Sequence, residues 1–203
     1  MVLLSRAEGV VELRVNGVFV MDSAHTATEH ELATLGMAAC DHPSRVLVGG
    51  LGLGFTARAC LEDARLEWLT VVEIEQPVVE WVTSGLVPGG QELAADPRLE
   101  IVVADLADHV RETRATYDVV LLDVDNGPGH LVHERNDRVY GHAFLRELRA
   151  RLSPGGVVVV WSAAESQELE RAMAAVFPQL QVIRRPVDLQ GRDEEYFLYA
   201  GHG

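Results

Sequence analysis

From Arg45 onward, the sequence alternates between short unbroken apolar runs and segments in which apolar residues recur at helical spacing. The apolar runs span residues 45–49, 67–75, 99–105, 117–125 and 157–162, and the helical segments span residues 55–63, 77–84, 106–114, 139–152 and 165–177. A strand that is covered on both faces has an unbroken Val, Ile and Leu sequence. Strands that alternate with helices form a parallel sheet with helices on both faces. The sequence therefore predicts an α/β fold built on a doubly wound, mostly parallel sheet.

The C-terminal part of the chain departs from this alternation. Residues 180–187 and 194–200 are rich in β-forming residues, and the polar segment between them contains no helical pattern. We therefore expect an antiparallel hairpin at the end of the sheet. The whole chain is then divided into a short N-terminal hairpin region, residues 1–24, and one main domain, residues 25–203.

The N-terminal region is predicted from one turn signal. Asn16-Gly17 lies between two runs rich in β-branched residues, and both residues of this pair accept the positive φ of a tight turn. We therefore expect a small β-hairpin over residues 10–22. The pattern Thr28-x-x-Glu31 that follows is typical of a capping box, which predicts a helix beginning there.

Composition excludes several classes of protein. The chain has 203 residues, of which 48% are hydrophobic and 24% charged, as in an ordinary globular domain. Its net charge of −14 argues against binding to a nucleic-acid backbone, which needs a basic patch. Cys40 and Cys60 cannot build a disulfide framework, and we expect them to be buried apolar residues. No apolar run is long enough for a membrane span or a signal peptide, so we expect a cytoplasmic protein.

A glycine-rich loop follows the first predicted strand of the main sheet. In open α/β sheets, ligands bind beyond the carboxyl ends of the strands. Gly50, Gly52 and Gly54 lie at such an end, where glycines let the backbone approach a ligand and open a helix whose N-terminus faces it. Glu73 ends the second strand, where a carboxylate can accept hydrogen bonds from both hydroxyls of a ribose. Together these residues predict a nucleoside site.

Three further carboxylates follow the next two strands. Asp105 ends the third strand, where it can accept an adenine amino group or cap the following helix, and Asp123 and Asp125 end the fourth. Because the carboxyl ends of parallel strands meet at one edge, we expect these side chains to line one cleft. A nicotinamide dinucleotide is an alternative ligand, since residues 52–57 also fit the pattern GxGxxA. A terminal antiparallel hairpin is, however, foreign to dinucleotide domains.

One other cluster could bind a metal ion. His130, His133, Glu134 and Asp137 have side chains of the right chemistry, but they lie in a predicted loop with no supporting motif. We therefore expect no metal site.

Six segments of the chain resemble those of one known family. The matching segments are residues 11–33, 45–54, 71–81, 95–110, 117–131 and 151–166, in order and in spacing. They resemble spermidine synthase and its relatives, the polyamine aminopropyltransferases. This resemblance implies a Rossmann-like fold of the class I S-adenosylmethionine-dependent methyltransferase type. It also implies S-adenosylmethionine or its decarboxylated form as the donor.

The resemblance leaves the nucleoside half of the site intact. The matching positions are Gly50, Gly52 and Gly54 for the glycine loop, Glu73 for the ribose, and Asp105 with Ala104 for the adenine. Asp123 matches the first aspartate of the family's Asp-Ser-x-Asp-Pro segment, which is called the gate, and His30 and Glu31 match the His-Glu of the N-terminal segment.

The polyamine half of the site departs from the family pattern. Leu53 stands where the family has a carboxylate that holds the aminopropyl group of the donor. Val20 replaces a glutamine, and Glu29 replaces the tyrosine before His-Glu. The second gate aspartate falls on Asn126, whose amide cannot take a proton from an attacking amine, and Asp125 is one residue earlier.

These departures favour a transferase with a changed donor or acceptor, and we expect methyl transfer somewhat ahead of aminopropyl transfer. The carboxylates Asp123, Asp125, Glu29 and Glu31 would bind a small cationic or hydroxylated acceptor. The alternatives are an aminopropyltransferase with a rearranged gate and a noncatalytic nucleoside-binding protein. The resemblance and the small apolar hairpin also predict a homodimer, with no nucleic-acid or membrane partner.

Overall fold

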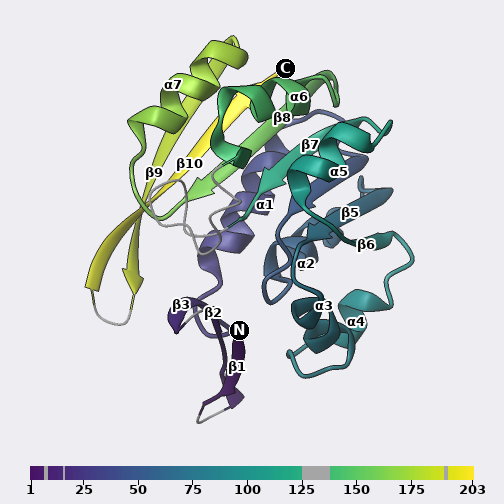
Figure 1. The fold of residues 1–203 in the computed structure, drawn as a ribbon, viewed down its shortest axis with the longest axis vertical. Coiled ribbons are helices and arrows are strands. Elements are labelled where there is room, and N and C mark those ends of the chain that lie inside the picture. The colour runs from purple at the N-terminus through teal and green to yellow at the C-terminus, as the bar shows by residue number, and fades with distance from the viewer. Residues whose placement is uncertain (7–8, 16, 125–137, 190–191) are drawn as a thin grey trace.

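A seven-stranded sheet forms the centre of the molecule (Figure 1). The computed structural model describes residues 1–6, 9–15, 17–124, 138–189 and 192–203. The strands of the sheet, in spatial order, are β6 (Leu99–Val103), β5 (Trp68–Glu73), β4 (Arg45–Gly49), β7 (Tyr117–Leu122), β8 (Leu152–Ser162), β10 (Arg192–His202) and β9 (Gln179–Leu189). The first five are mutually parallel, and β10 runs antiparallel to both of its neighbours. The predicted doubly wound sheet and its C-terminal hairpin are confirmed.

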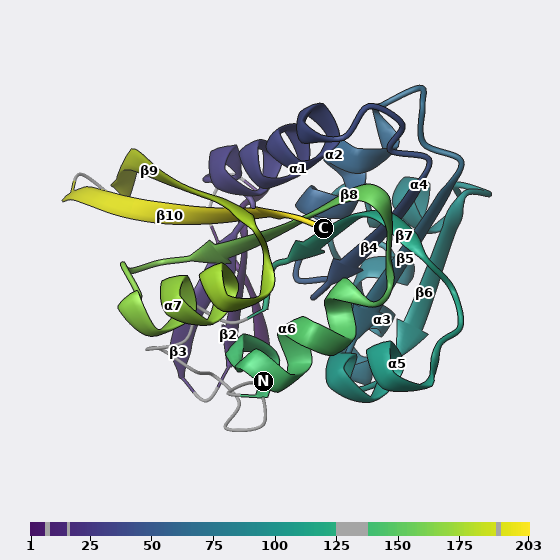
Figure 2. The same cartoon turned by 90° about the horizontal axis from the view of Figure 1, so that it is seen from above.

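Helices cover both faces of this sheet (Figure 2). One face carries α1 (Ala27–Ala39), α2 (Phe55–Leu61), α3 (Gln76–Thr83) and the short α4 (Gly90–Ala94), and the other carries α5 (Leu106–Glu112), α6 (His142–Arg149) and α7 (Gln167–Val176). No helix in the described ranges is long and apolar enough to cross a membrane.

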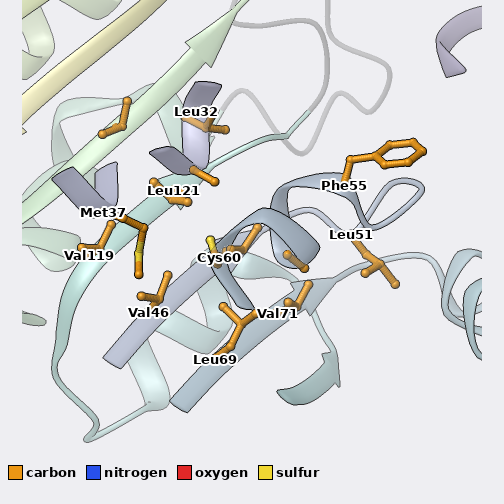
Figure 3. Packing of buried hydrophobic residues seen from close by; sticks show 14 of the residues in the cluster. Leu32, Met37, Val46, Leu51, Phe55, Cys60, Leu69, Val71, Val119 and Leu121 are labelled. Atoms are coloured by element: carbon orange, nitrogen blue, oxygen red, sulfur yellow. The ribbon is translucent and has the colours of Figure 1, made fainter. Parts of the chain in front are cut away.

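The unbroken apolar runs of the sequence arise because alternate residues of each strand enter different cores. On β7, Val119 and Leu121 pack under α1, whereas Val120 and Leu122 pack against the opposite layer. Figure 3 shows the α1 side of this packing, where Leu32 lies against the strand residues. Each such side chain contributes about 1.5–3 kcal/mol when fully buried.

Helix α1 lies unusually close to the sheet. A Cβ atom on Gly36 would come within 2.5 Å of a methyl group of Leu121 and 3.0 Å of one of Val119. A side chain at this position would force Leu121 or Val119 to shift, and glycine avoids that displacement. The contact therefore fixes the height of α1 above the strand.

The N-terminal region forms its own antiparallel sheet of three strands, β1 (Val2–Ser5), β2 (Val11–Val15) and β3 (Val18–Asp22). The predicted hairpin corresponds to β2 and β3, and β1 was not predicted. Val11 and Leu13 of β2 are buried in the same core as α1, so the hairpin packs against the main domain of its own chain.

Two local predictions were wrong. The capping box does not form, because α1 begins after Thr26, the Thr28 hydroxyl donates to Glu29, and Glu31 pairs with Arg185. The helix predicted over residues 139–152 is confined to α6, since Leu152 already begins β8.

Candidate active site

The carboxylate of Glu73 fixes the glycine loop to the end of β5. Its Oε2 accepts the backbone N–H of Leu51 at 2.8 Å, and its Oε1 accepts the N–H of Glu75 at 2.8 Å. The residue is only 8% exposed, and burial raises the pKa of its carboxyl above the ordinary range. A carboxylate held in this way is preorganised, with lone pairs left for a further donor such as a ribose hydroxyl.

The loop touches the end of β7 at Gly50. This residue has φ +92°, and a Cβ atom on it would lie 2.2 Å from the carbonyl oxygen of Asp123. A glycine is therefore required here both for its backbone angle and for its closeness to the next strand. The glycine loop and the residue that follows β7, Asp123, are therefore in direct contact.

Asp123 hydrogen-bonds to the helix after the loop. The Thr56 hydroxyl donates to its Oδ2 at 2.6 Å, and burial raises the pKa of its carboxyl. The following carbonyl, of Val124, accepts a hydrogen bond from the Tyr140 hydroxyl. The other two predicted gate residues, Asp125 and Asn126, lie outside the described residues, as do the four residues of the possible metal cluster.

Asp105 has two partners. Its Oδ1 accepts the N–H groups of Ala107 at 2.9 Å and Asp108 at 3.3 Å, so it caps α5, and its Oδ2 pairs with Arg138 at 2.6 Å. The alternative prediction that Asp105 caps the following helix is therefore confirmed. Ala104 beside it donates its N–H to the Glu73 carbonyl, which places the two carboxylates on adjacent strand ends.

Glu29 faces the same edge from α1. Burial and the nearby charge of Asp123 raise the pKa of its carboxyl to about 7, while a hydrogen bond from Thr28, at 2.8 Å to Oε2, acts in the opposite direction. His30 next to it is half-buried. Glu31 forms an ion pair with Arg185 of β9 and so joins α1 to the C-terminal hairpin.

Leu53 does not open onto this edge through its side chain. It is 1% exposed and belongs to the apolar core on the α1 side of the sheet, while its N–H points toward the Met21 sulfur at 3.2 Å. Met21 also covers Gly52, since a Cβ atom there would lie 2.6 Å from that sulfur. The thioether of the N-terminal sheet therefore lies directly on the glycine loop.

Two aromatic side chains are in contact near the carboxyl end of β8. Trp161, at the carboxyl end of β8, meets Tyr196 of β10 edge to face, with ring centroids 5.0 Å apart. The indole N–H of Trp161 is buried without a hydrogen-bond partner among the described atoms. Leu122 pairs with Val160, so this ring pair begins at the same level of the sheet as Asp123.

Sequence reasoning missed four side chains that organise this edge, namely Met21, Thr56, Arg138 and Tyr140. Of these four, only Thr56 could have been predicted from the sequence to lie at this edge, because it is in the first turn of the helix after the glycine loop. Cys40 and Cys60 are buried as predicted, and burial raises the pKa of the Cys60 thiol to about 12. Within the described residues, no three His, Cys, Asp or Glu side chains are grouped to hold a metal ion.

Comparison with known proteins decides the family. The model of the spermine/spermidine synthase domain matches residues 14–182. The chain belongs to this family. Among curated relatives, polyamine aminopropyltransferase 2 of Pseudomonas aeruginosa is 30% identical over 187 residues, which cover 86% of this chain and 52% of that protein. Polyamine aminopropyltransferase of Ruegeria is 32% identical over 170 residues, which cover 78% of this chain and 57% of that protein.

Solved structures share the fold. A spermidine synthase in complex with the transition-state analogue AdoDATO has a TM-score of 0.84 at 20% identity, covering 98% of this chain and 69% of that one. Human methyltransferase-like protein 13 in complex with SAH has a TM-score of 0.64 at 22% identity, covering 83% of this chain and 80% of that one. The predicted class I methyltransferase type of fold is confirmed.

The comparisons correct one expectation. The curated relatives are aminopropyltransferases, so the preference for methyl transfer is not supported, and the alternative with a rearranged gate fits better. The chain of this spermidine-synthase-like protein spans about half the length of the curated relatives it matches.

Proposed function

We propose that this chain transfers the aminopropyl group of decarboxylated S-adenosylmethionine to a small amine. The observation that carries the proposal is the buried Glu73 carboxylate, which bridges the N–H groups of Leu51 and Glu75 beside the glycine loop. Family membership supports the choice of donor. The same edge carries the further carboxylates that a nucleoside and an amine require.

Each carboxylate has a separate role in this proposal. Glu73 accepts the ribose hydroxyls, and Asp105 with Ala104 receives the adenine. Asp123, held by Thr56, orients the amine toward the carbon next to the sulfonium. Much of the rate enhancement then comes from holding the two reactants in line, which is worth up to about 7–11 kcal/mol in well-oriented reactions.

Product analysis tests this function directly. The 203-residue chain is incubated with decarboxylated S-adenosylmethionine and putrescine, or another short diamine, and methylthioadenosine release is followed by mass spectrometry. We expect release that depends on both substrates and an amine product enlarged by one aminopropyl group. S-Adenosylmethionine with the same amines is the comparison. Methylated amine from that arm, or no binding of either donor or of methylthioadenosine in calorimetry, would contradict the proposal.

A further inference from the structure

We propose that Glu29 is the group that removes the proton from the acceptor nitrogen in this chain. This inference rests on the proposed aminopropyl transfer and deepens it, since it assigns the proton acceptor of that reaction. Asn126, which matches the second gate aspartate in the family resemblance, is an amide and cannot serve as a base. Among the described residues, Glu29 on α1 is the carboxylate that interacts electrostatically with Asp123 without being paired to a guanidinium.

The position of Glu29 follows from the pattern of α1. The buried residues of this helix are Leu32, Ala33, Gly36 and Met37, which form one stripe along the side that faces the sheet. Residues three, four and seven apart lie on the same face of a helix. Glu29 precedes three of these buried residues at those intervals, so it is the N-terminal member of the buried stripe.

The same geometry places Glu29 opposite the gate. Gly36 lies against Val119 and Leu121 of β7. Two helical turns separate Gly36 from Glu29, a distance of about 10 Å. About three strand residues cover that distance, so Glu29 is level with the end of β7, where Asp123 stands. The influence of Asp123 on the Glu29 carboxyl agrees with this placement.

Burial and the surrounding groups set the proton affinity of the Glu29 carboxyl. Thr28 donates to its Oε2, Asp123 faces it from β7, and Asp22 faces it from β3. Asp22 is itself occupied by His25, whose ring nitrogen lies 3.0 Å away. A general base works best when its pKa lies near the working pH, and that of Glu29 is about 7.

The proposed reaction takes two steps, removal of a proton from the acceptor and transfer of the aminopropyl group, and conserves atoms and charge. The acceptor ammonium gives one proton to the ionised Glu29 carboxylate and becomes a neutral amine. Its lone pair then forms the C–N bond as the C–S bond breaks, and the electron pair of that bond stays on sulfur to give a neutral thioether. Glu29 returns the proton to solvent, and the secondary ammonium product leaves with the remaining positive charge. Asp123 stays in place as the counter-charge of the nitrogen.

The test compares Glu29→Gln with Asp41→Asn. Both substitutions replace a carboxyl group by its amide, but Asp41 is exposed beyond the end of α1. We expect Glu29→Gln to lower kcat by 10²- to 10⁴-fold, the usual contribution of a positioned base. We expect the wild-type rise of kcat around pH 7 to disappear in this variant. Donor affinity, measured by calorimetry, should stay within a factor of about three, and Glu29→Asp should recover part of the rate.

The outcomes separate this inference from the function on which it rests. If the wild-type chain transfers no aminopropyl group, the proposed function fails. If the wild type is active and Glu29→Gln keeps its rate and its pH profile, the function stands and the role of Glu29 is refuted. A loss of rate together with an equal loss of donor affinity would mean that Glu29 acts on the structure of the site, which also overturns the inference.

Discussion

Carboxylates of the same chemistry have different roles here because their surroundings differ. Glu73 is held by backbone N–H groups, Glu31 by the guanidinium of Arg185, and Glu29 by a threonine hydroxyl close to Asp123. The identities of these residues are readable in the sequence, but their partners are not. Glu31 was expected to bind the acceptor, and its partner lies 154 positions away in the chain.

Replacing Glu73 tests the nucleoside half of the site. We expect Glu73→Ala to weaken binding of decarboxylated S-adenosylmethionine by on the order of 2–4 kcal/mol, the worth of one or two charge-assisted hydrogen bonds. The variant should also melt earlier, since the N–H groups of Leu51 and Glu75 lose their acceptor. Calorimetry and thermal unfolding measure the two effects. Glu80→Ala, at an exposed position on α3, is the control, and equal affinities for the two variants would contradict the role of Glu73.

The raised pKa of Glu29 predicts how stability changes with pH. Below about pH 4.5 the carboxyl is protonated in both the folded and the unfolded chain, so it contributes nothing. As the pH rises to about 7, the unfolded chain ionises first and the free energy of unfolding falls, by up to about 3 kcal/mol in total. Glu29→Gln should therefore gain stability relative to the wild type between pH 5 and pH 8 in urea unfolding. A constant difference between the two proteins would exclude this linkage.

At the scale of helices and strands, the sequence predicts those elements that have a clear periodic pattern of apolar residues. The five parallel strands and the C-terminal hairpin could be predicted because their apolar runs are long and are separated by helical or polar segments. The short β1 and α4 are not readable, because the four residues of β1 become a strand only by pairing with β2, and α4 has only five residues. The close approach of α1 to β7 could not be predicted either, because a glycine within a helical pattern does not indicate which strand it packs against.

Enlarging Gly36 tests this close approach. We expect Gly36→Val to lower the free energy of unfolding by about 1–3 kcal/mol, because the new side chain meets Leu121 and Val119 at overlapping distances. It should also reduce turnover, since it lifts the helix that carries Glu29. Ala38→Val, on the exposed side of the same helix, should cost about 0.5 kcal/mol and leave turnover unchanged. Similar unfolding midpoints for the two variants would show that α1 does not need its glycine.

At the scale of the whole molecule, the described structure changes the reason for expecting a dimer. The hairpin was expected to need a second subunit, but Val11 and Leu13 are already buried against their own chain. The expectation now depends on the family resemblance and on the general frequency of symmetric pairs. The net charge of −14 acts against association at low salt.

Light scattering tests the assembly. We expect a mass of twice the 22.2 kDa chain, with the dimer strengthened as salt screens the net negative charge. A mass of one chain from low to high micromolar concentration, in both low and high salt, would refute the homodimer.

The ion pair between Glu31 and Arg185 has a consequence for the order of assembly. The strands β4, β5, β6 and β7 with their connecting helices lie within residues 45–122, so the nucleoside edge forms from nearby segments. The pair of Glu31 and Arg185, in contrast, joins α1 to a hairpin made of the last strands in the sequence. The proposed nucleoside edge therefore depends on segments close together in the chain, whereas the contact of α1 with β9 spans 154 positions. Contacts between distant segments form late, so we expect the join between α1 and the C-terminal hairpin to be completed after the parallel strands have paired.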